Sequence, residues 1–66
     1  MLSRRDPTKD PKPGDIFGVG KHKIEFLGWE CGFTDFRYVG SLEVKTTFNV
    51  EFARMIAKAK VLHVAD

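Results

Sequence analysis

The sequence predicts a small, mostly β domain with a single helix, in the order β-β-β-β-α-β. At 66 residues the chain has room for one domain at most. Apolar and polar residues alternate from His22 to Trp29 and again from Phe33 to Val39, as they do in strands that bury one face. After Thr46 the spacing of apolar residues changes to about 3.6, which indicates one helix.

The first 13 residues are expected to form a flexible arm. They contain all three prolines and many charges, with too little apolar surface to offset the entropy of ordering. The folded domain is then expected to span residues 14–66. It begins at the turn signal Pro13-Gly14-Asp15, and a first short strand follows from Ile16 to Val19.

The next hairpin, from His22 to Val39, fits two registers. A two-residue loop at Cys31 and Gly32 would place Arg37 opposite Phe26 on the buried face. A three-residue loop that also includes Glu30 gives chemically coherent pairs on both faces, and it is preferred. Its pairs are Phe26 with Phe36, Ile24 with Tyr38, Glu25 with Arg37, and Trp29 with Phe33.

A turn at Val39, Gly40 and Ser41 extends the same pattern to a further strand. The inner face then carries apolar pairs and the outer face carries opposite charges. The expected pairs are Tyr38 with Leu42, Phe36 with Val44, Arg37 with Glu43, and Asp35 with Lys45. A slip of one residue would turn every side chain of this strand to the other face.

The helix is predicted from an apolar stripe that is expected to join the core. The stripe consists of Phe48, Phe52, Met55, Ile56 and Ala59, with Thr47 or Asn49 as the N-cap. A short final strand is expected from Val61 to Ala65. The best-fitting architecture is a small SH3-like half-open barrel, and an open antiparallel sheet with the helix packed across it is the alternative.

Composition and charge exclude several classes of function. The formal net charge is +2, with both signs interspersed, which is mild for a protein that binds polyanions strongly. No apolar run approaches the roughly 20 residues of a membrane span, and no apolar stretch follows the N-terminal arginines as in a secretory signal. We therefore expect a cytoplasmic protein without contact with a membrane.

The residue types offer neither a catalytic centre nor a metal or cofactor site. One cysteine cannot form an internal disulfide, and His22, Cys31 and His63 are scattered rather than spaced as zinc ligands. Cys31 lies at a predicted hairpin tip without a base and an orienting group beside it. The sequence therefore predicts a protein that is not an enzyme and carries no cofactor.

Two surfaces are candidates for binding. Leu27, Trp29 and Phe33 are expected on the face that does not carry the core, where aromatic side chains often anchor protein interfaces. They would otherwise form a second small core under the helix, the arm or the partner of a homodimer. The alternative surface is basic, with Lys21, Lys23 and Arg37 as contacts to nucleic acid, although acidic neighbours across the strands would neutralise part of it.

The opening from Asp10 to Ile16, with its Pro-Lys-Pro-Gly-Asp sequence, resembles that of many short proteins encoded by phages and prophages. The helix followed directly by Lys60, Val61 and Leu62 resembles their closing segment. The resemblance implies an SH3-like barrel and an accessory protein that binds and redirects a host protein, in the cytoplasm of the host. It implies no catalytic residues.

Overall fold

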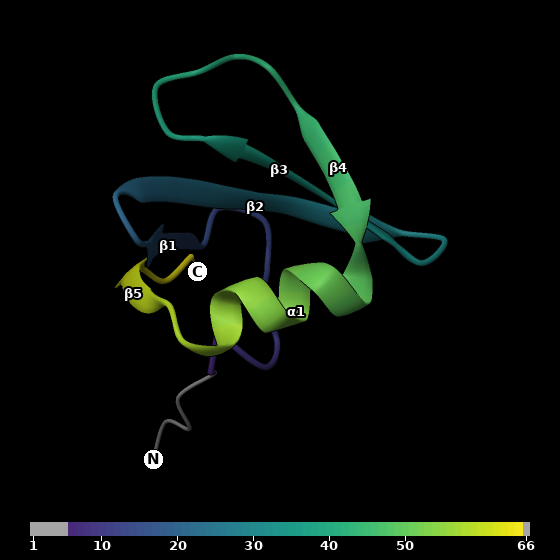
Figure 1. Ribbon diagram of the computed structural model, residues 1–66, viewed down its shortest axis with the longest axis horizontal. Coiled ribbons are helices and arrows are strands. Elements are labelled where there is room, and N and C mark those ends of the chain that lie inside the picture. Colours follow the sequence, from purple (N-terminus) through teal and green to yellow (C-terminus); the bar gives the residue numbers. More distant parts are fainter. Residues whose placement is uncertain (1–5, 66) are drawn as a thin grey trace.

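The computed structural model describes residues 6–65 and contains five strands and one helix (Figure 1). The predicted order β-β-β-β-α-β is confirmed. The elements are β1 (Ile16–Val19), β2 (His22–Glu30), β3 (Phe33–Tyr38), β4 (Lys45–Phe48), α1 (Asn49–Ala57) and β5 (Lys60–His63). The final strand thus begins one residue earlier than expected and ends at His63.

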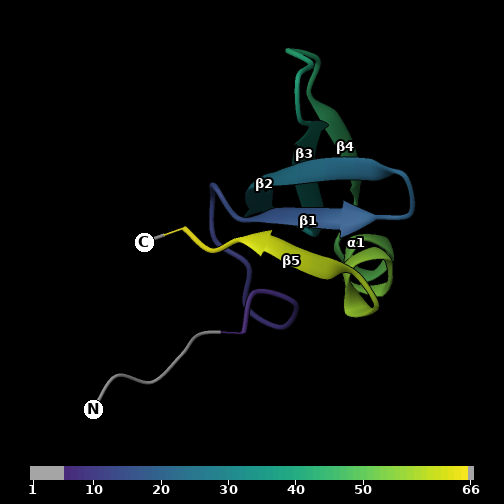
Figure 2. The ribbon, with the colours of Figure 1, turned by 90° about the vertical axis from the view of Figure 1, so that its left-hand side faces the viewer.

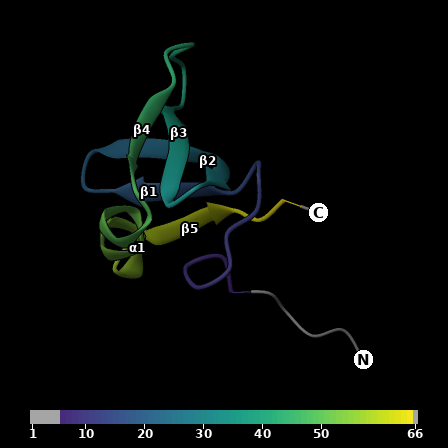
Figure 3. The same ribbon diagram turned by 90° about the vertical axis from the view of Figure 1, so that its right-hand side faces the viewer.

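The strands form one antiparallel sheet in the order β4-β3-β2-β1-β5. The sheet is open, with β4 and β5 as its two edges, so the mostly β fold with one helix is confirmed and the strands do not close into a cylinder. β2 is the longest strand and pairs with both β1 and β3. Figures 2 and 3 show β3 and β4 turned steeply against β1 and β5, with α1 below β3 and β4 and at about the height of β5.

The core lies between the sheet and α1. Its buried residues are Phe17, Ile24, Phe26, Phe36, Phe52 and Ile56. Phe52 stands at the centre, with its ring centroid 5.6 Å from those of both Phe26 and Phe36 and 6.3 Å from that of Phe17. The predicted helical spacing is confirmed for Phe52 and Ile56, while Met55 and Ala59 pack against the core and are partly buried.

The β2–β3 hairpin combines the two registers that the sequence allowed. Its loop has two residues, Cys31 and Gly32, both with positive φ (48° and 84°), because Glu30 pairs with Phe33. A β-bulge between Phe26 and Gly28 then shifts the register by one residue. Beyond the bulge Phe26 faces Phe36 and Glu25 faces Arg37, as predicted, whereas the predicted pair of Trp29 with Phe33 is wrong.

The predicted register of the β3–β4 pair is also wrong, by one residue. Phe36 faces Lys45 and Asp35 faces Thr46, so the side chains of this segment lie on the faces opposite to those expected. Leu42 and Val44 consequently lie outside the core, 96% and 55% exposed, in the loop before β4. The hydroxyl of Thr46 donates to Asp35 Oδ1 (2.9 Å), and Lys45 forms an ion pair with Glu43 (3.6 Å) instead of Asp35.

The start of α1 corrects the expected role of Phe48. Phe48 ends β4 and is the N-cap residue of α1, with extended backbone angles, and its side chain is 61% exposed rather than part of the core. Within residues 6–65 no side chain caps the helix. Asn49 instead accepts, through Oδ1, a hydrogen bond from the hydroxyl of the buried Thr34 (2.6 Å), which ties the first turn of α1 to β3.

The segment before β1 packs against the domain from Asp6 onward. Pro7 and Pro11 are buried, and a turn forms in which the Lys9 and Asp10 amides donate to the Asp6 carbonyl. Hydrogen bonds from the hydroxyl and the amide of Thr8 hold the pKa of the Asp6 carboxyl below its usual value. The flexibility expected for the arm stays a prediction, and residues 1–5 of it lie outside the described part of the chain.

The fully buried Asp15 joins the two ends of the domain. Its carboxylate accepts the Lys12 amide through Oδ2 (2.8 Å) and the Ala65 amide through Oδ1 (2.7 Å). Its backbone carbonyl accepts the Phe26 amide (2.9 Å). One side chain therefore connects the segment before β1 with the segment after β5.

Candidate protein-binding surface

Trp29 lies on the core side of the sheet rather than on the face where it was expected. The bulge changes the alternation of β2, so that Trp29 pairs with the buried Thr34. Its ring packs edge-on against Phe26 (centroids 5.1 Å apart) and Phe52 (6.4 Å). Trp29 therefore covers one end of the core. Its other side faces the solvent, since 44% of its surface remains exposed.

Phe33 and Phe48 form a stacked pair on the outer face, the face of the sheet opposite to the core. They are direct cross-strand partners of β3 and β4, with ring centroids 5.2 Å apart and ring planes inclined by 26°. The two side chains are 44% and 61% exposed. We call these two residues the outer aromatic pair. Val50, two residues after Phe48 in α1, is 62% exposed.

The structure therefore divides the predicted set of Leu27, Trp29 and Phe33. Trp29 and Phe33 lie on opposite faces of the sheet, because Trp29 pairs with the inward Thr34 and Phe33 with Phe48. Leu27 lies at the bulge and is half-buried. Their role in binding a partner stays a prediction, but they do not form one patch.

Phe48 is the surface residue that the sequence analysis missed. It fits the helical stripe, since Phe52 and Ile56 follow at intervals of four residues, and this spacing placed it in the core. The contrary signal was the β-branched pair Thr46 and Thr47, which favours a strand that continues up to the helix. Strand alternation then puts Phe48 on the same face as Thr46.

The predicted basic residues are spread over two parts of the sheet. Lys21 and Lys23 are exposed at the turn between β1 and β2 and at the start of β2. Arg37 is half-buried on β3, where it forms an ion pair with Glu25 through Nη2 and donates from Nη1 to the Ser41 carbonyl (2.8 Å). The expected pairing of Glu25 with Arg37 is confirmed, and it takes Arg37 out of the basic set.

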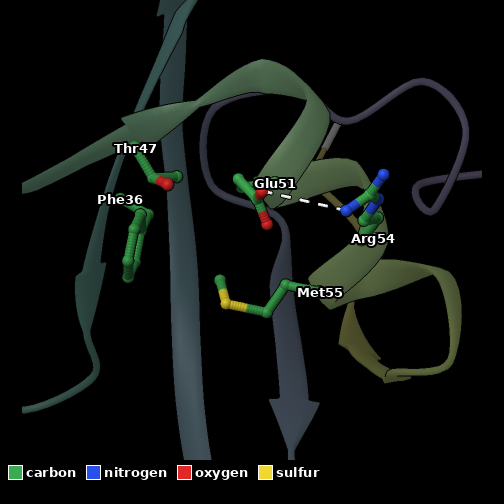
Figure 4. Close-up of a pocket in the computed structure, with 5 residues that line it drawn as sticks. All are labelled: Phe36, Thr47, Glu51, Arg54 and Met55. Carbon is green, nitrogen blue, oxygen red and sulfur yellow. Dashed lines mark ion pairs between the residues drawn. The ribbon is translucent and has the colours of Figure 1, made fainter.

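A shallow hollow of about 450 Å³ lies where α1 meets β3 and β4 (Figure 4). Phe36 and Met55 give it apolar walls, and Thr47, Glu51 and Arg54 line it with polar groups. Glu51 and Arg54, three residues apart on α1, form an ion pair at 3.8 Å through Glu51 Oε2. The hollow is open to the solvent beside β4, an edge of the sheet.

The cysteine and the histidines are separated. Cys31 is exposed at the tip of the β2–β3 hairpin, while His22 stands at the other end of β2, against the ring of Tyr38. His63 lies on β5 opposite Ile16. Within residues 6–65 no group of three His, Cys, Asp or Glu side chains is placed to hold a metal ion. The single helix in that range is too short to cross a membrane.

The outer aromatic pair is thus an exposed aromatic contact between two strands, and the hollow beside β4 is a concavity on the other face of the sheet. Comparison with protein-family models, with curated proteins and with solved structures gives no match for this chain.

Proposed function

We propose that this chain is a non-enzymatic accessory protein that binds another protein and modulates it, with the outer aromatic pair at the centre of the contact. The single observation that carries the proposal is the stacking of Phe33 on Phe48 on the face of the sheet that α1 does not cover. Two large apolar rings, 44% and 61% exposed, stand there side by side.

Stacked aromatic rings suit an interface for an energetic reason. Each ring offers a large apolar area to a partner, and such residues dominate the binding energy of protein interfaces. The two rings hold each other in place, so that little side-chain freedom is lost when a partner docks. Glu30, the cross-strand partner of Phe33, and Asp35 with Thr46 provide a polar border around the pair.

The resemblance to short phage and prophage proteins supports a host protein as the partner. Such accessory proteins act by occupying a surface of a host factor, which requires a docking face and no catalytic machinery. The exposed rings of the outer aromatic pair support a docking face of this kind. The basic residues support nucleic-acid binding less well, because Arg37 is engaged by Glu25 and Ser41.

A capture experiment with matched variants tests the proposal. The tagged protein is incubated with bacterial lysate, with and without nuclease, and bound proteins are identified by mass spectrometry. Phe33→Ser removes one ring of the pair at a position already 44% exposed, so the fold is expected to persist. Leu42→Ser is the control, because Leu42 is 96% exposed and apolar but lies in the loop before β4.

We expect one stoichiometric protein that survives nuclease, is lost with Phe33→Ser and is retained with Leu42→Ser. The affinity of the Phe33→Ser variant for the purified partner should be lower than that of the wild type by about thirtyfold or more, as expected for a central interface aromatic. Equal capture by the wild type and Phe33→Ser would contradict the proposed surface. Recovery of nuclease-sensitive complexes alone would indicate a nucleic-acid-binding protein instead.

A further inference from the structure

The free edge of β4 offers backbone groups in a definite pattern. The Asn49 amide donates to the Gly32 carbonyl (3.0 Å), so the pair of residues 49 and 32 is a hydrogen-bonded pair of the β3–β4 ladder. Such pairs alternate along an antiparallel ladder, so Thr47 and Lys45 also bond to β3. The amides of Thr46 and Phe48 and the carbonyl of Thr46 therefore point away from β3, toward the open edge.

We propose that two copies of this chain join edge to edge through β4, antiparallel, with the two-fold axis at Thr46. In this register the amide of Thr46 in each copy donates to the Thr46 carbonyl of the other. The Phe48 amide of each copy reaches the Val44 carbonyl of the other. Each of these hydrogen bonds uses a backbone group that points away from β3, and the two residues of each cross-strand pair lie on the same face of the joined sheet. A shift of one residue between the two copies would break both conditions.

The outer face gives such a dimer its apolar contact. With Thr46 on the axis, Phe48 of one copy stands directly opposite Val44 of the other. These side chains are 61% and 55% exposed in the single chain, and neither belongs to the core. Two equal contacts form, one on each side of the axis, and each lies next to the Phe33 ring that stacks on Phe48.

The inner face gives it complementary charge. The same register places Lys45 of the second copy directly opposite Thr47, at the mouth of the hollow that Thr47 and Glu51 line. Arg54 lies as far as 3.8 Å from Oε2 of Glu51, so this exposed carboxylate can also receive the ammonium group of Lys45 from the second copy. Lys45 faces Thr47 rather than its own symmetry mate, so no like charges stand directly opposite each other.

This dimer goes beyond the proposed function and does not depend on it. It joins the two five-stranded sheets into one and covers the β4 edge, beside which no further strand lies within residues 6–65. It also brings two outer aromatic pairs onto one continuous face. The second copy completes the hollow beside β4 with a lysine that the single chain does not place there.

The first test uses the backbone bond at Thr46. The mass in solution is measured by light scattering over a range of concentrations up to about 1 mM, where even weak self-association is populated. We expect the wild type to reach twice the chain mass of 7.5 kDa. Thr46→Pro removes the outward amide, whereas Thr46→Ala keeps it and loses the same hydroxyl bond to Asp35. We expect Thr46→Pro to weaken the dimer by about thirtyfold relative to Thr46→Ala, since two symmetric hydrogen bonds are lost.

The second test does not require Thr46→Pro to fold. Lys45→Glu and Glu51→Lys should each weaken self-association, because a like-charged pair then forms across the axis. Mixed together, the two variants should form a one-to-one heterodimer, in which each inner-face contact again joins opposite charges. No change within one chain can produce that recovery.

A wild type that stays monomeric throughout would overturn the proposal, as would a mixture no heavier than its two components. Phe33→Ser, which abolishes capture under the proposed function, keeps the Thr46 hydrogen bonds and the contacts between Lys45 and Glu51, so this variant should still form the dimer. Loss of partner binding and loss of the dimer are thus separate outcomes.

Discussion

Replacing Asp15 should show that one buried carboxylate holds the two ends of the domain together. Asp15 is fully buried, and its two oxygens accept the amides of Lys12 and Ala65 at 2.8 and 2.7 Å. Those donors belong to the segment before β1 and the segment after β5. Asp15→Ala leaves both amides without this acceptor and detaches both segments from it.

The magnitude follows from these two bonds. A hydrogen bond to a charged group contributes about 1.5–3 kcal/mol, and both segments lie near the surface, where water can replace part of the loss. We therefore expect Asp15→Ala to lower the free energy of unfolding by about 3 kcal/mol. A chain of this size has about 3–10 kcal/mol in total, so the variant would approach the limit of folding. Asp15→Asn should lose at least half as much, because its amide nitrogen would face one of the two donors.

Urea unfolding followed by circular dichroism measures the effect, as a lower midpoint with an unchanged slope. Asp35→Ala is the matched control: Asp35 accepts the exposed hydroxyl of Thr46, and the loss of this bond should cost less than about 1 kcal/mol. A loss below about 1 kcal/mol for both Asp15 variants would refute the reasoning. A loss for Asp35→Ala as large as that for Asp15→Ala would refute it as well.

Two further predictions concern the core contacts of α1 and the turn between β2 and β3. Phe52→Ala should lower the free energy of unfolding by about 3–5 kcal/mol, because the Phe52 ring contacts those of Phe17, Phe26, Trp29 and Phe36. Phe48→Ala should lower it by about 1 kcal/mol or less, since Phe48 is 61% exposed. Equal losses in thermal unfolding would contradict the assignment of Phe52 to the core and Phe48 to the outer face. Cys31→Asn should raise the free energy of unfolding by about 0.5–1 kcal/mol, since Cys31 holds φ at 48° in a two-residue turn that favours Asn before Gly32, and a decrease in the urea midpoint would contradict this turn.

Local pattern predicted the elements of this fold well. The alternation along β2 and β3 and the change of spacing before Phe52 follow from which side chains must leave water, and burial is a property of each residue type. The pairing of Phe26 with Phe36 and of Glu25 with Arg37 was found because both faces of the hairpin agreed. The same pattern also placed Phe52 and Ile56 in the core correctly.

The candidate surface was predicted only in part, because its placement depends on a single residue of register. A bulge next to Gly28 lets the hairpin keep a tight turn at Cys31 and Gly32 and still pair Phe26 with Phe36. This bulge separates Trp29 from Phe33. The alternation along β2 does not predict the bulge, because a two-residue loop and a three-residue loop are both compatible with the residues of this turn.

The sequence by itself determined the order of the elements, the single helix and most of the buried aromatic residues, because these depend on hydrophobic spacing within short segments. Only the tertiary structure decided which way the side chains of β4 point and what Phe48 does. Contacts between residues far apart in the sequence accompany the observed register of β3 and β4. Thr34 bonds to Asn49, Thr46 bonds to Asp35, and Phe52 takes the centre of the core, so Phe48 remains outside, stacked on Phe33.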